Sequence, residues 1–321
     1  MGRMDPVALL QGVSSLVDRG RVRRLVPAAA LVFLVASLLV SGAPAHAPSI
    51  LRVIHWADRL NVVDLSLLLL LIAATSIFLQ PLLRYGEAVI EGTAPVGPLL
   101  NPIKRILINR KRYKLVALEA HYQELAERRV KGNINMDEEE EFAYINLKLS
   151  RSPTRYRMAA TALGNLLRAA DEYPLYRYGL DLRVALPRLL QLLPKEARAS
   201  FEGQQDDLQF AVNFVVVLAL GALISTALLA RDGLWLFLPV ILFALAFLAY
   251  NNALTAAAEY GEAERVLFDL YRFRLYQKLN LRLPTSSEEE RHLGRELTRG
   301  LWVGFENTPY IQPFTDPTEE G

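Results

Sequence analysis

Four long apolar stretches limit what this chain of 321 residues can fold into more than any other feature. They span residues 25–41, 62–83, 210–230 and 234–250, and Asp64 is the only charged residue in them. A helix of roughly 17 to 25 apolar residues crosses a bilayer, and it satisfies its backbone hydrogen bonds internally, as lipid requires. We therefore expect four transmembrane helices. Asp64 falls in a first helical turn, where a negative charge suits the helix dipole and needs no functional explanation.

The connections between these stretches predict the fold class. Only Arg231, Asp232 and Gly233 separate the third stretch from the fourth, so these two helices should form a hairpin. We expect an all-α integral membrane protein with two transmembrane hairpins and a cytoplasmic helical bundle. The predicted parts are the N-terminus with the first hairpin (1–83), a cytoplasmic helical domain (84–207), the second hairpin (208–252), and a helix extension with an extended tail (253–321).

The first apolar stretch has an alternative interpretation as a cleaved signal peptide. Residues 19–24 carry four arginines, and residues 45–47 (Ala-His-Ala) resemble a cleavage site between small residues. The apolar run is, however, longer than the roughly 7 to 15 residues of a signal peptide, and Pro48 would follow the cut. We expect an uncleaved anchor.

The distribution of Lys and Arg predicts the orientation. All of these residues lie in segments 1–24, 84–207 and 253–321, with three exceptions: Arg52, Arg59 and Arg231. Cytoplasmic flanks of membrane helices carry the excess of positive charge. Both termini and the large middle segment should therefore be cytoplasmic.

Composition and motifs exclude several classes of function. The 36 Lys and Arg residues against 34 Asp and Glu give a net charge of +2, too small for a general nucleic-acid binder. The absence of cysteine excludes disulfides, thiolate metal sites and cysteine nucleophiles. The four histidines are scattered, and the sequence contains no phosphate-binding loop, nucleophile elbow or H-E-x-x-H motif. We expect no metal, no cofactor and no enzymatic activity.

The polar middle segment predicts several helices. Their expected spans are 103–131, 135–149, 152–173, 182–193 and 195–207, the last of which continues into the third apolar stretch. Asn135 and Glu138 have the spacing of a capping box. Pro153 suits the first position of a helix, and Pro174 should end one.

The fourth apolar stretch should continue as a charged helix to about residue 279. Its apolar residues recur at helical spacing and predict one buried stripe: Ala263, Val266, Leu267, Leu270, Phe273 and Leu275. Ser286 and Glu289 predict the cap of a further helix that ends at Gly300. The prolines beyond it predict an extended tail.

A basic run follows the second apolar stretch. It consists of Lys104, Arg105, Arg110, Lys111, Arg112 and Lys114. Cations near a membrane attract anionic lipid headgroups, so we expect lipid contact here. The alternatives are a solvated helix face and, least favoured, nucleic-acid binding.

A second polar cluster surrounds the predicted helix end at Pro174. It consists of Asn165, Arg168, Glu172, Tyr173, Tyr176, Arg177, Tyr178 and Asp181. We expect Arg168 to pair with Asp171 or Glu172 at helical spacing, and Arg177 to pair with Asp181. The cluster has two interpretations: a site for an anionic ligand such as a nucleotide, or a structural corner between helices.

The same region carries a distinctive motif. Its pattern is L-G-N-x-L-R-A-A-E-x-Y-P-x-x-R-Y-G-x-D, and the matching positions are Leu163, Gly164, Asn165, Leu167, Arg168, Ala169, Ala170, Tyr173, Pro174, Arg177, Tyr178, Gly179 and Asp181. Asp171 stands where the pattern has Glu. In this motif the chain resembles a family of uncharacterised bacterial multi-pass inner-membrane proteins. The resemblance covers about a tenth of the chain and implies a location but no known activity.

These observations favour a non-enzymatic inner-membrane protein whose cytoplasmic helical domain mediates protein contacts, most simply in a homo-oligomer. Its expected partners are membrane lipids, further copies of the chain and a cytoplasmic protein, but no nucleic acid. The alternative is an oligomeric ligand-gated pore or membrane-perturbing effector, with a ligand site near Arg168 and Arg177. The least favoured function is a membrane-bound enzyme that uses Glu172, Tyr176 and Asp181.

Overall fold

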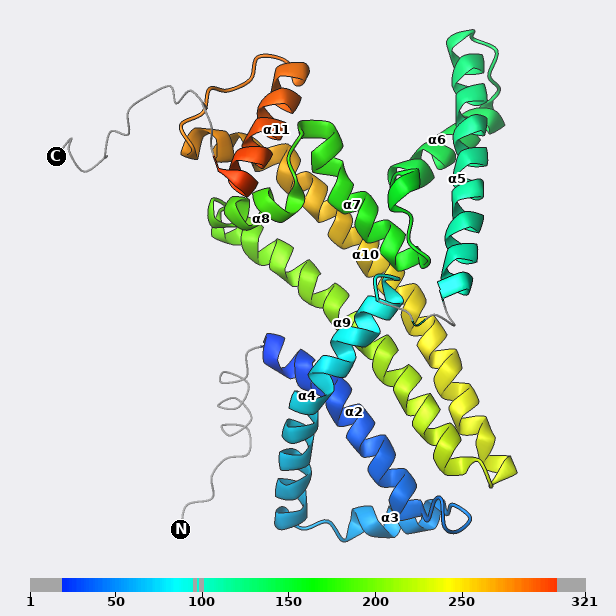
Figure 1. Ribbon diagram of the computed structural model, residues 1–321. Helices are drawn as coiled ribbons and strands as arrows, with labels where there is room; N and C mark the ends of the chain where they lie inside the picture. Colours follow the sequence, from blue (N-terminus) through cyan, green and yellow to red (C-terminus); the bar gives the residue numbers. More distant parts are fainter. Residues whose placement is uncertain (1–18, 95–96, 98–100, 305–321) are drawn as a thin grey trace, which may run out of the picture. The chain divides into compact units, whose positions relative to one another are not determined.

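All regular structure in the described residues is helical (Figure 1). The computed structural model describes residues 19–94, 97 and 101–304. Along the chain the helices are α2 (Arg19–Ser41), α3 (Ile50–Asp58), α4 (Val62–Ile90), α5 (Asn101–Val130), α6 (Met136–Ser150), the 3₁₀ helix η1 (Arg155–Arg157), α7 (Ala162–Tyr178), α8 (Leu182–Gln191), α9 (Lys195–Leu229), the 3₁₀ helix η2 (Gly233–Leu236), α10 (Phe237–Lys278) and α11 (Ser287–Val303). The all-α prediction is confirmed for these residues. The extended tail was predicted to follow Gly300, but residues 301–303 belong to α11, and the part after residue 304 lies outside the described residues.

Three helices are long and apolar enough to cross a membrane. They are α4, α9 and the continuous η2–α10 segment, Gly233–Lys278. The predicted first span falls on α2, whose described apolar part, Val26–Ser41, is shorter. The structure therefore shows three candidate spans by length and composition.

Helix α4 exposes apolar side chains that water would not favour. Leu69 is 67% exposed and Phe78 is 83% exposed. Burying such side chains is the main driving force for folding in water, so their exposure along a whole helix fits a lipid environment. The helix begins with a local cap: Asn61 Oδ1 accepts from the backbone N–H of Asp64, whose carboxylate accepts from the N–H of Asn61. Asp64 thus has the helix-end position expected from the sequence.

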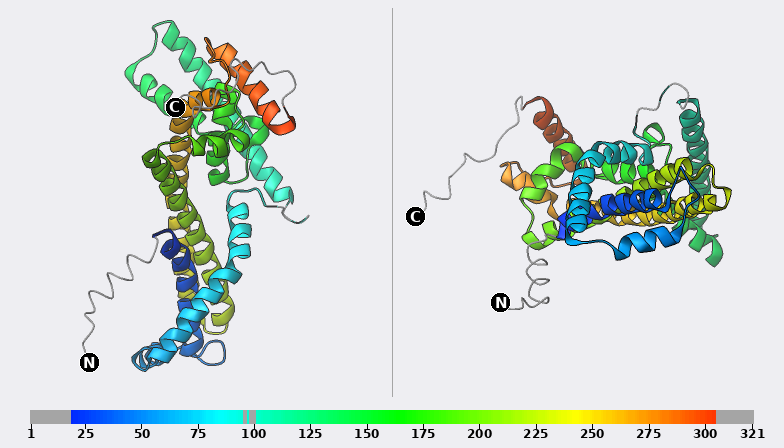
Figure 2. Two further views of the ribbon diagram at one scale, coloured as in Figure 1. Left: turned by 90° about the vertical axis from the view of Figure 1, so that its left-hand side faces the viewer. Right: turned by 90° about the horizontal axis from the view of Figure 1, so that it is seen from below.

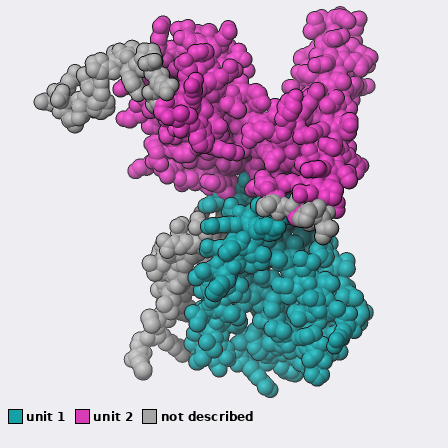
Figure 3. Space-filling view, viewed as in Figure 1, with its two compact units in different colours: residues 1–90, 206–253 teal, residues 91–205, 254–321 magenta. Residues whose placement is uncertain are grey.

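The chain divides into two units (Figure 3). Unit 1 comprises residues 1–90 and 206–253, and unit 2 comprises residues 91–205 and 254–321. In unit 1, helices α2, α4 and α9 meet at a cluster of small and aliphatic side chains: Ala28, Leu31, Leu79 and Val217. Gly221 of α9 faces Leu34 of α2 so closely that a β-carbon would collide with it. Such a close approach is typical of small residues at a helix-packing face.

Unit 2 has its own core, formed by helices α7 to α11. The largest fully buried side chains in this core are Tyr276 and Phe268 of α10. Helices α9 and α10 each run as one unbroken helix from their apolar part into their polar part, as predicted (Figure 2). A separate small core of Leu125, Phe142 and Ile145 joins α5 to α6.

Local capping signals place three helix ends correctly. Asn135 and Glu138 form a complete capping box at the start of α6. Ser286 caps α11 by accepting from the backbone N–H of Glu289. Helix α5 ends within one residue of its predicted end.

Two predicted helix ends are wrong. No α-helix begins at Pro153: contacts from α7 hold the segment 154–159, whose only helical part is the short 3₁₀ helix η1, and α7 starts at Ala162, capped by Thr161. Pro174 lies inside α7, which continues to Tyr178. A proline removes one helical hydrogen bond, yet α7 continues for one more turn: Pro174 is fully buried, and Gly179 caps the helix end.

The predicted stripe on α10 is only partly buried. Leu267 and Leu275 lie in the core, as expected. Val266, Leu270 and Phe273 are instead 45%, 66% and 37% exposed. The buried face turns toward Phe268 and includes the carboxyl side chain of Glu264, which is fully buried.

Candidate functional site

The polar cluster of residues 165–181 forms the corner at which α7 ends and α8 begins. Gly179 ends α7 with a φ of 75°, a backbone conformation that glycine adopts at little cost. Its N–H donates to the carbonyl of Leu175, and the N–H of Leu180 donates to that of Pro174. Gly294 of α11 packs against the carbonyl of Tyr178, with no space for a β-carbon.

One hydroxyl from α11 connects both sides of this corner. Thr298 Oγ1 accepts from the backbone N–H of Asp181 at 3.0 Å and donates to the carbonyl of Gly179 at 3.1 Å. The Asp181 carboxylate caps α8 by accepting from the N–H of Arg183 at 2.9 Å. Each of these groups would otherwise be an unpaired polar group at a helix end.

Two tyrosines of α7 share one carboxylate of α10. Tyr173 and Tyr178 both donate to Asp269, at 2.9 and 2.5 Å. The guanidinium of Arg272 lies over the Tyr178 ring, 4.2 Å from its centroid, and pairs with Glu290 of α11 at 2.6 Å. Burial and the hydrogen bond to Asp269 raise the pKa of Tyr178, so this phenol stays a donor.

Two further side chains of α7 hold the segment that precedes the helix. Asn165 accepts from the N–H of Ala159 at 2.6 Å and donates to its carbonyl at 3.2 Å. The buried carboxylate of Glu172 accepts from both the N–H and the hydroxyl of Thr154 and lies 3.3 Å from Nε of Arg157.

Neither predicted ion pair of the cluster forms in the described residues. Arg168 donates to the carbonyl of Arg157 at 2.7 Å, and Asp181 serves as a helix cap. Arg177 and Tyr176 are exposed and line a cavity of about 420 Å³ that extends to Glu119 of α5. The remaining side chains of the cluster bind the protein's own groups, which favours the structural corner over one convergent ligand site.

The structure brings together three arginines that the sequence analysis did not connect. Arg157, Arg168 and Arg183 line one cavity together with Asp171. Burial raises the pKa of Asp171, although the charges of Arg157, Arg183 and Arg168 act in the opposite direction. Arginines on three different elements carry no spacing signal, so only the fold could reveal this grouping.

Glu264 is a second feature that the sequence analysis missed. It lies on α10, 14 residues beyond the apolar stretch, and neither carboxyl oxygen has a hydrogen-bond partner within the described part of the chain. Burial, helped by the nearby charge of Asp171, raises the pKa of Glu264 to about 8. The sequence does contain a signal for this residue. The helical spacing of Glu264 from Ala257 and Phe268 places it on the same buried face of the helix.

The basic run divides into two faces of α5. Lys104 donates to the carbonyl of Ala94, and Arg112 donates to that of Arg155. Lys111 is half-buried, and burial lowers its pKa. The remaining three cations are exposed: Arg105, Arg110 and Lys114. Only these three are free to meet lipid headgroups.

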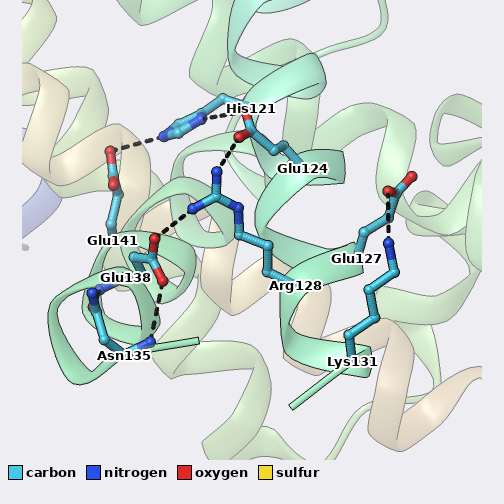
Figure 4. Close-up of polar contacts among 8 residues, drawn as sticks. All are labelled: His121, Glu124, Glu127, Arg128, Lys131, Asn135, Glu138 and Glu141. Carbon is cyan, nitrogen blue, oxygen red and sulfur yellow. Dashed lines mark hydrogen bonds and ion pairs between the residues drawn. The ribbon is translucent and has the colours of Figure 1, made fainter. Parts of the chain in front are cut away.

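The hairpin of α5 and α6 carries an exposed ion-pair network (Figure 4). Arg128 bridges Glu124 and Glu138, at 2.6 and 2.7 Å, and His121 lies 3.0 Å from Glu141. Exposed pairs of this kind contribute little stability individually. The acidic run 137–141 is thus a helix N-terminus with local partners and a structural role.

No group of three or more His, Asp or Glu side chains in the described residues could hold a metal ion. Comparisons with protein-family models, with curated proteins and with solved structures gave no match. The resemblance of residues 161–194 to a bacterial membrane-protein family therefore stays a prediction.

Proposed function

We propose that this chain is a four-span protein of the bacterial inner membrane whose polar helical unit joins copies of the chain into a homo-oligomer, with no catalytic role. Three candidate spans and the apolar part of α2 support the membrane assignment. The concentration of Lys and Arg in segments 1–24, 84–207 and 253–321 supports cytoplasmic termini. The oligomer rests on a further observation, the exposed face of α10.

An apolar row on α10 lies outside the core of its own unit. Val266, Leu270 and Phe273 are separated by four and three residues, so they lie on one helix face. Ala263 is half-buried against the edge of the core, but it continues the row at the same spacing, so the steps along the helix alternate between three and four residues. This is the spacing of a coiled-coil seam, and a row of exposed apolar side chains marks an interaction surface.

A second copy of the chain is the partner that fits this row. Copies inserted in one orientation in one membrane present their α10 helices in parallel. The row of one copy then meets the same row of the other, as in a parallel coiled coil. In that register Asp269 of one copy flanks the seam opposite Arg274 of the second copy, and their charges are complementary.

Cysteine cross-linking tests the parallel arrangement directly, because the natural chain contains no cysteine. Leu270→Cys should form a disulfide-linked dimer in native membranes under mild oxidation. Val130→Cys, at a similarly exposed apolar residue of α5, is the matched control and should remain monomeric. Equal cross-linking at both positions would indicate random collision and contradict the proposal.

The oligomeric state provides an independent test. The protein in mild detergent should be a defined multimer by light scattering. Leu270→Lys should dissociate it, because a charge at the centre of an apolar seam is costly to bury. Val130→Lys should leave it intact. A monodisperse monomer for the unmodified protein would overturn the proposal.

A further inference from the structure

Three guanidinium groups from different elements surround one cavity of unit 2. Arg157 ends η1, Arg168 lies in α7, and Arg183 lies in the first turn of α8. The cavity has a volume of about 370 Å³, and its further lining includes Glu91, Thr93 and Asp171. An adjoining cavity of about 270 Å³ shares Arg157, Asp171 and Arg183 with it. We refer to both together as the arginine cavity.

Most hydrogen-bond donors of these arginines are unused within the protein. A guanidinium carries five N–H donors. Arg168 uses one on the carbonyl of Arg157, and Arg157 directs its Nε toward Glu172. The side chain of Arg183 donates to no group in the described part of the chain, and its charge acts on the neighbouring Asp171. The arginine cavity therefore offers donors to a ligand.

Two of the three arginines, Arg157 and Arg168, are held in place before any ligand arrives. Glu172 is buried and is fixed by two hydrogen bonds from Thr154, and it in turn holds Arg157. The bond from Arg168 to the Arg157 carbonyl connects α7 to η1. Arginines positioned in advance lose less conformational entropy on binding, which strengthens binding for a given set of contacts.

We propose that the arginine cavity binds a phosphate group, carried by a small soluble phosphate ester or by a phospholipid headgroup. Arginine forks match phosphate oxygens in pairs. A carboxylate has only two oxygens, whereas a phosphate group offers enough acceptors for three guanidinium groups. One water occupies about 30 Å³ in the liquid, so about 370 Å³ leaves space for an organic group beside the phosphate. Asp171 and Glu91 would accept from hydroxyl groups of that part and would repel a second phosphate.

Calorimetric titration of the full chain in a non-ionic detergent, with glycerol phosphate as the probe, tests the soluble case. Arg183→Gln removes an exposed guanidinium and should weaken binding about tenfold or more, since a hydrogen bond to a charged group contributes roughly 1.5–3 kcal/mol. Arg177→Gln is the matched control, because Arg177 belongs to the same motif but does not line the arginine cavity. Asp171→Asn should strengthen binding by removing a negative charge.

Native mass spectrometry with added phosphatidic acid or phosphatidylcholine tests the lipid case. Preferential retention of phosphatidic acid, lost in Arg183→Gln and kept in Arg177→Gln, would assign the phosphate to a lipid. The proposal is overturned if neither glycerol phosphate nor phosphatidic acid binds, or if Arg177→Gln weakens binding as much as Arg183→Gln. Loss of binding in Asp171→Asn would also overturn it, because it would indicate a cationic ligand. A failed oligomer test would leave these results unaffected.

Discussion

Gly294 of α11 packs against the backbone carbonyl of Tyr178 in α7, with no space between them for a β-carbon. Gly179, the C-cap residue that follows α7, is also in close contact with the backbone of α11 and has a positive φ. Two glycines thus allow two helix backbones to approach directly. The contact explains why the corner between α7 and α8 depends on α11 for its stability, although α11 lies more than a hundred residues further along the chain.

Gly294→Ala should destabilise unit 2 by about 2 kcal/mol or more, because the added methyl group must displace backbone atoms of α7. Gly203→Ala is the matched control. Gly203 lies inside α9 with nothing within 4 Å of an added β-carbon, so alanine there should stabilise the helix by about 0.5–1 kcal/mol. Thermal unfolding in detergent measures both. Equal stability of the two variants would contradict the described contact.

Thr298→Val should destabilise the corner by about 1–2 kcal/mol. The substitution keeps the side-chain volume but leaves the N–H of Asp181 and the carbonyl of Gly179 without their partner. Thr298→Ser retains the hydroxyl and should restore most of the loss. The free energy of unfolding in denaturant checks both, and a serine variant as unstable as the valine variant would assign the effect to packing.

Glu264→Gln should stabilise the protein in a pH-dependent manner. Burial raises the pKa of Glu264 to about 8 in the folded chain, from the ordinary value of 4.5 for a glutamate. The stability tied to its protonated form is therefore fully present below pH 4.5 and is lost as the pH rises through about 8. The advantage of the glutamine variant should grow between these limits and then level off.

Unfolding midpoints from pH 5 to pH 9 measure this advantage. Glu262→Gln, on the exposed side of the same helix, should show no such trend. A constant difference between Glu264→Gln and the unmodified protein across this range would mean that Glu264 does not titrate there.

Asn135→Ala should destabilise the start of α6 by about 1 kcal/mol, because it removes an N-cap and half of a capping box. Hydrogen exchange should quicken in the first turn of α6 and remain unchanged in α7. Asn109→Ala, at an exposed position of α5, is the control and should have no comparable effect. Unchanged exchange at Glu138 in the Asn135→Ala variant would refute the prediction.

The parts of the fold that depend on neighbouring residues were predictable from the sequence. Asn135 and Glu138 are three residues apart, and their capping box forms as expected. The start of α7 was not predictable, because the segment before it is held by Glu172, 18 residues from Thr154. A local proline signal at Pro153 cannot compete with such contacts. The same applies to Pro174, which is fully buried inside α7 and is followed by the helix cap at Gly179.

In the candidate sites, too, local spacing was predictable from the sequence, whereas contacts between different elements were not. The spacing within α7 placed Arg168 near Asp171 and Glu172, but it could not show that the Arg157 carbonyl was the better partner. The arginine cavity joins residues from η1, α7 and α8 and has no linear signature. On α10 the predicted helical spacing was correct, but the apolar residues lie on more than one face of the helix, so the spacing does not tell which face is buried. Only packing against α7 and α9 decides that Phe268 and Glu264 are buried and Leu270 is exposed.

The hydroxyl of Thr298 reaches Asp181 across 117 residues of sequence. During translation the ribosome completes α7 and α8 long before it adds α11. Until then the N–H of Asp181 and the carbonyl of Gly179 must form hydrogen bonds with water, and the side of the corner that α11 covers is exposed to solvent. The core of unit 2 is thus completed late in synthesis, after the hydrophobic segments of α9 and α10 have left the ribosome. A chain that ends before residue 287 lacks α11. Its α7–α8 corner should therefore be less stable, although the corner itself is encoded far upstream.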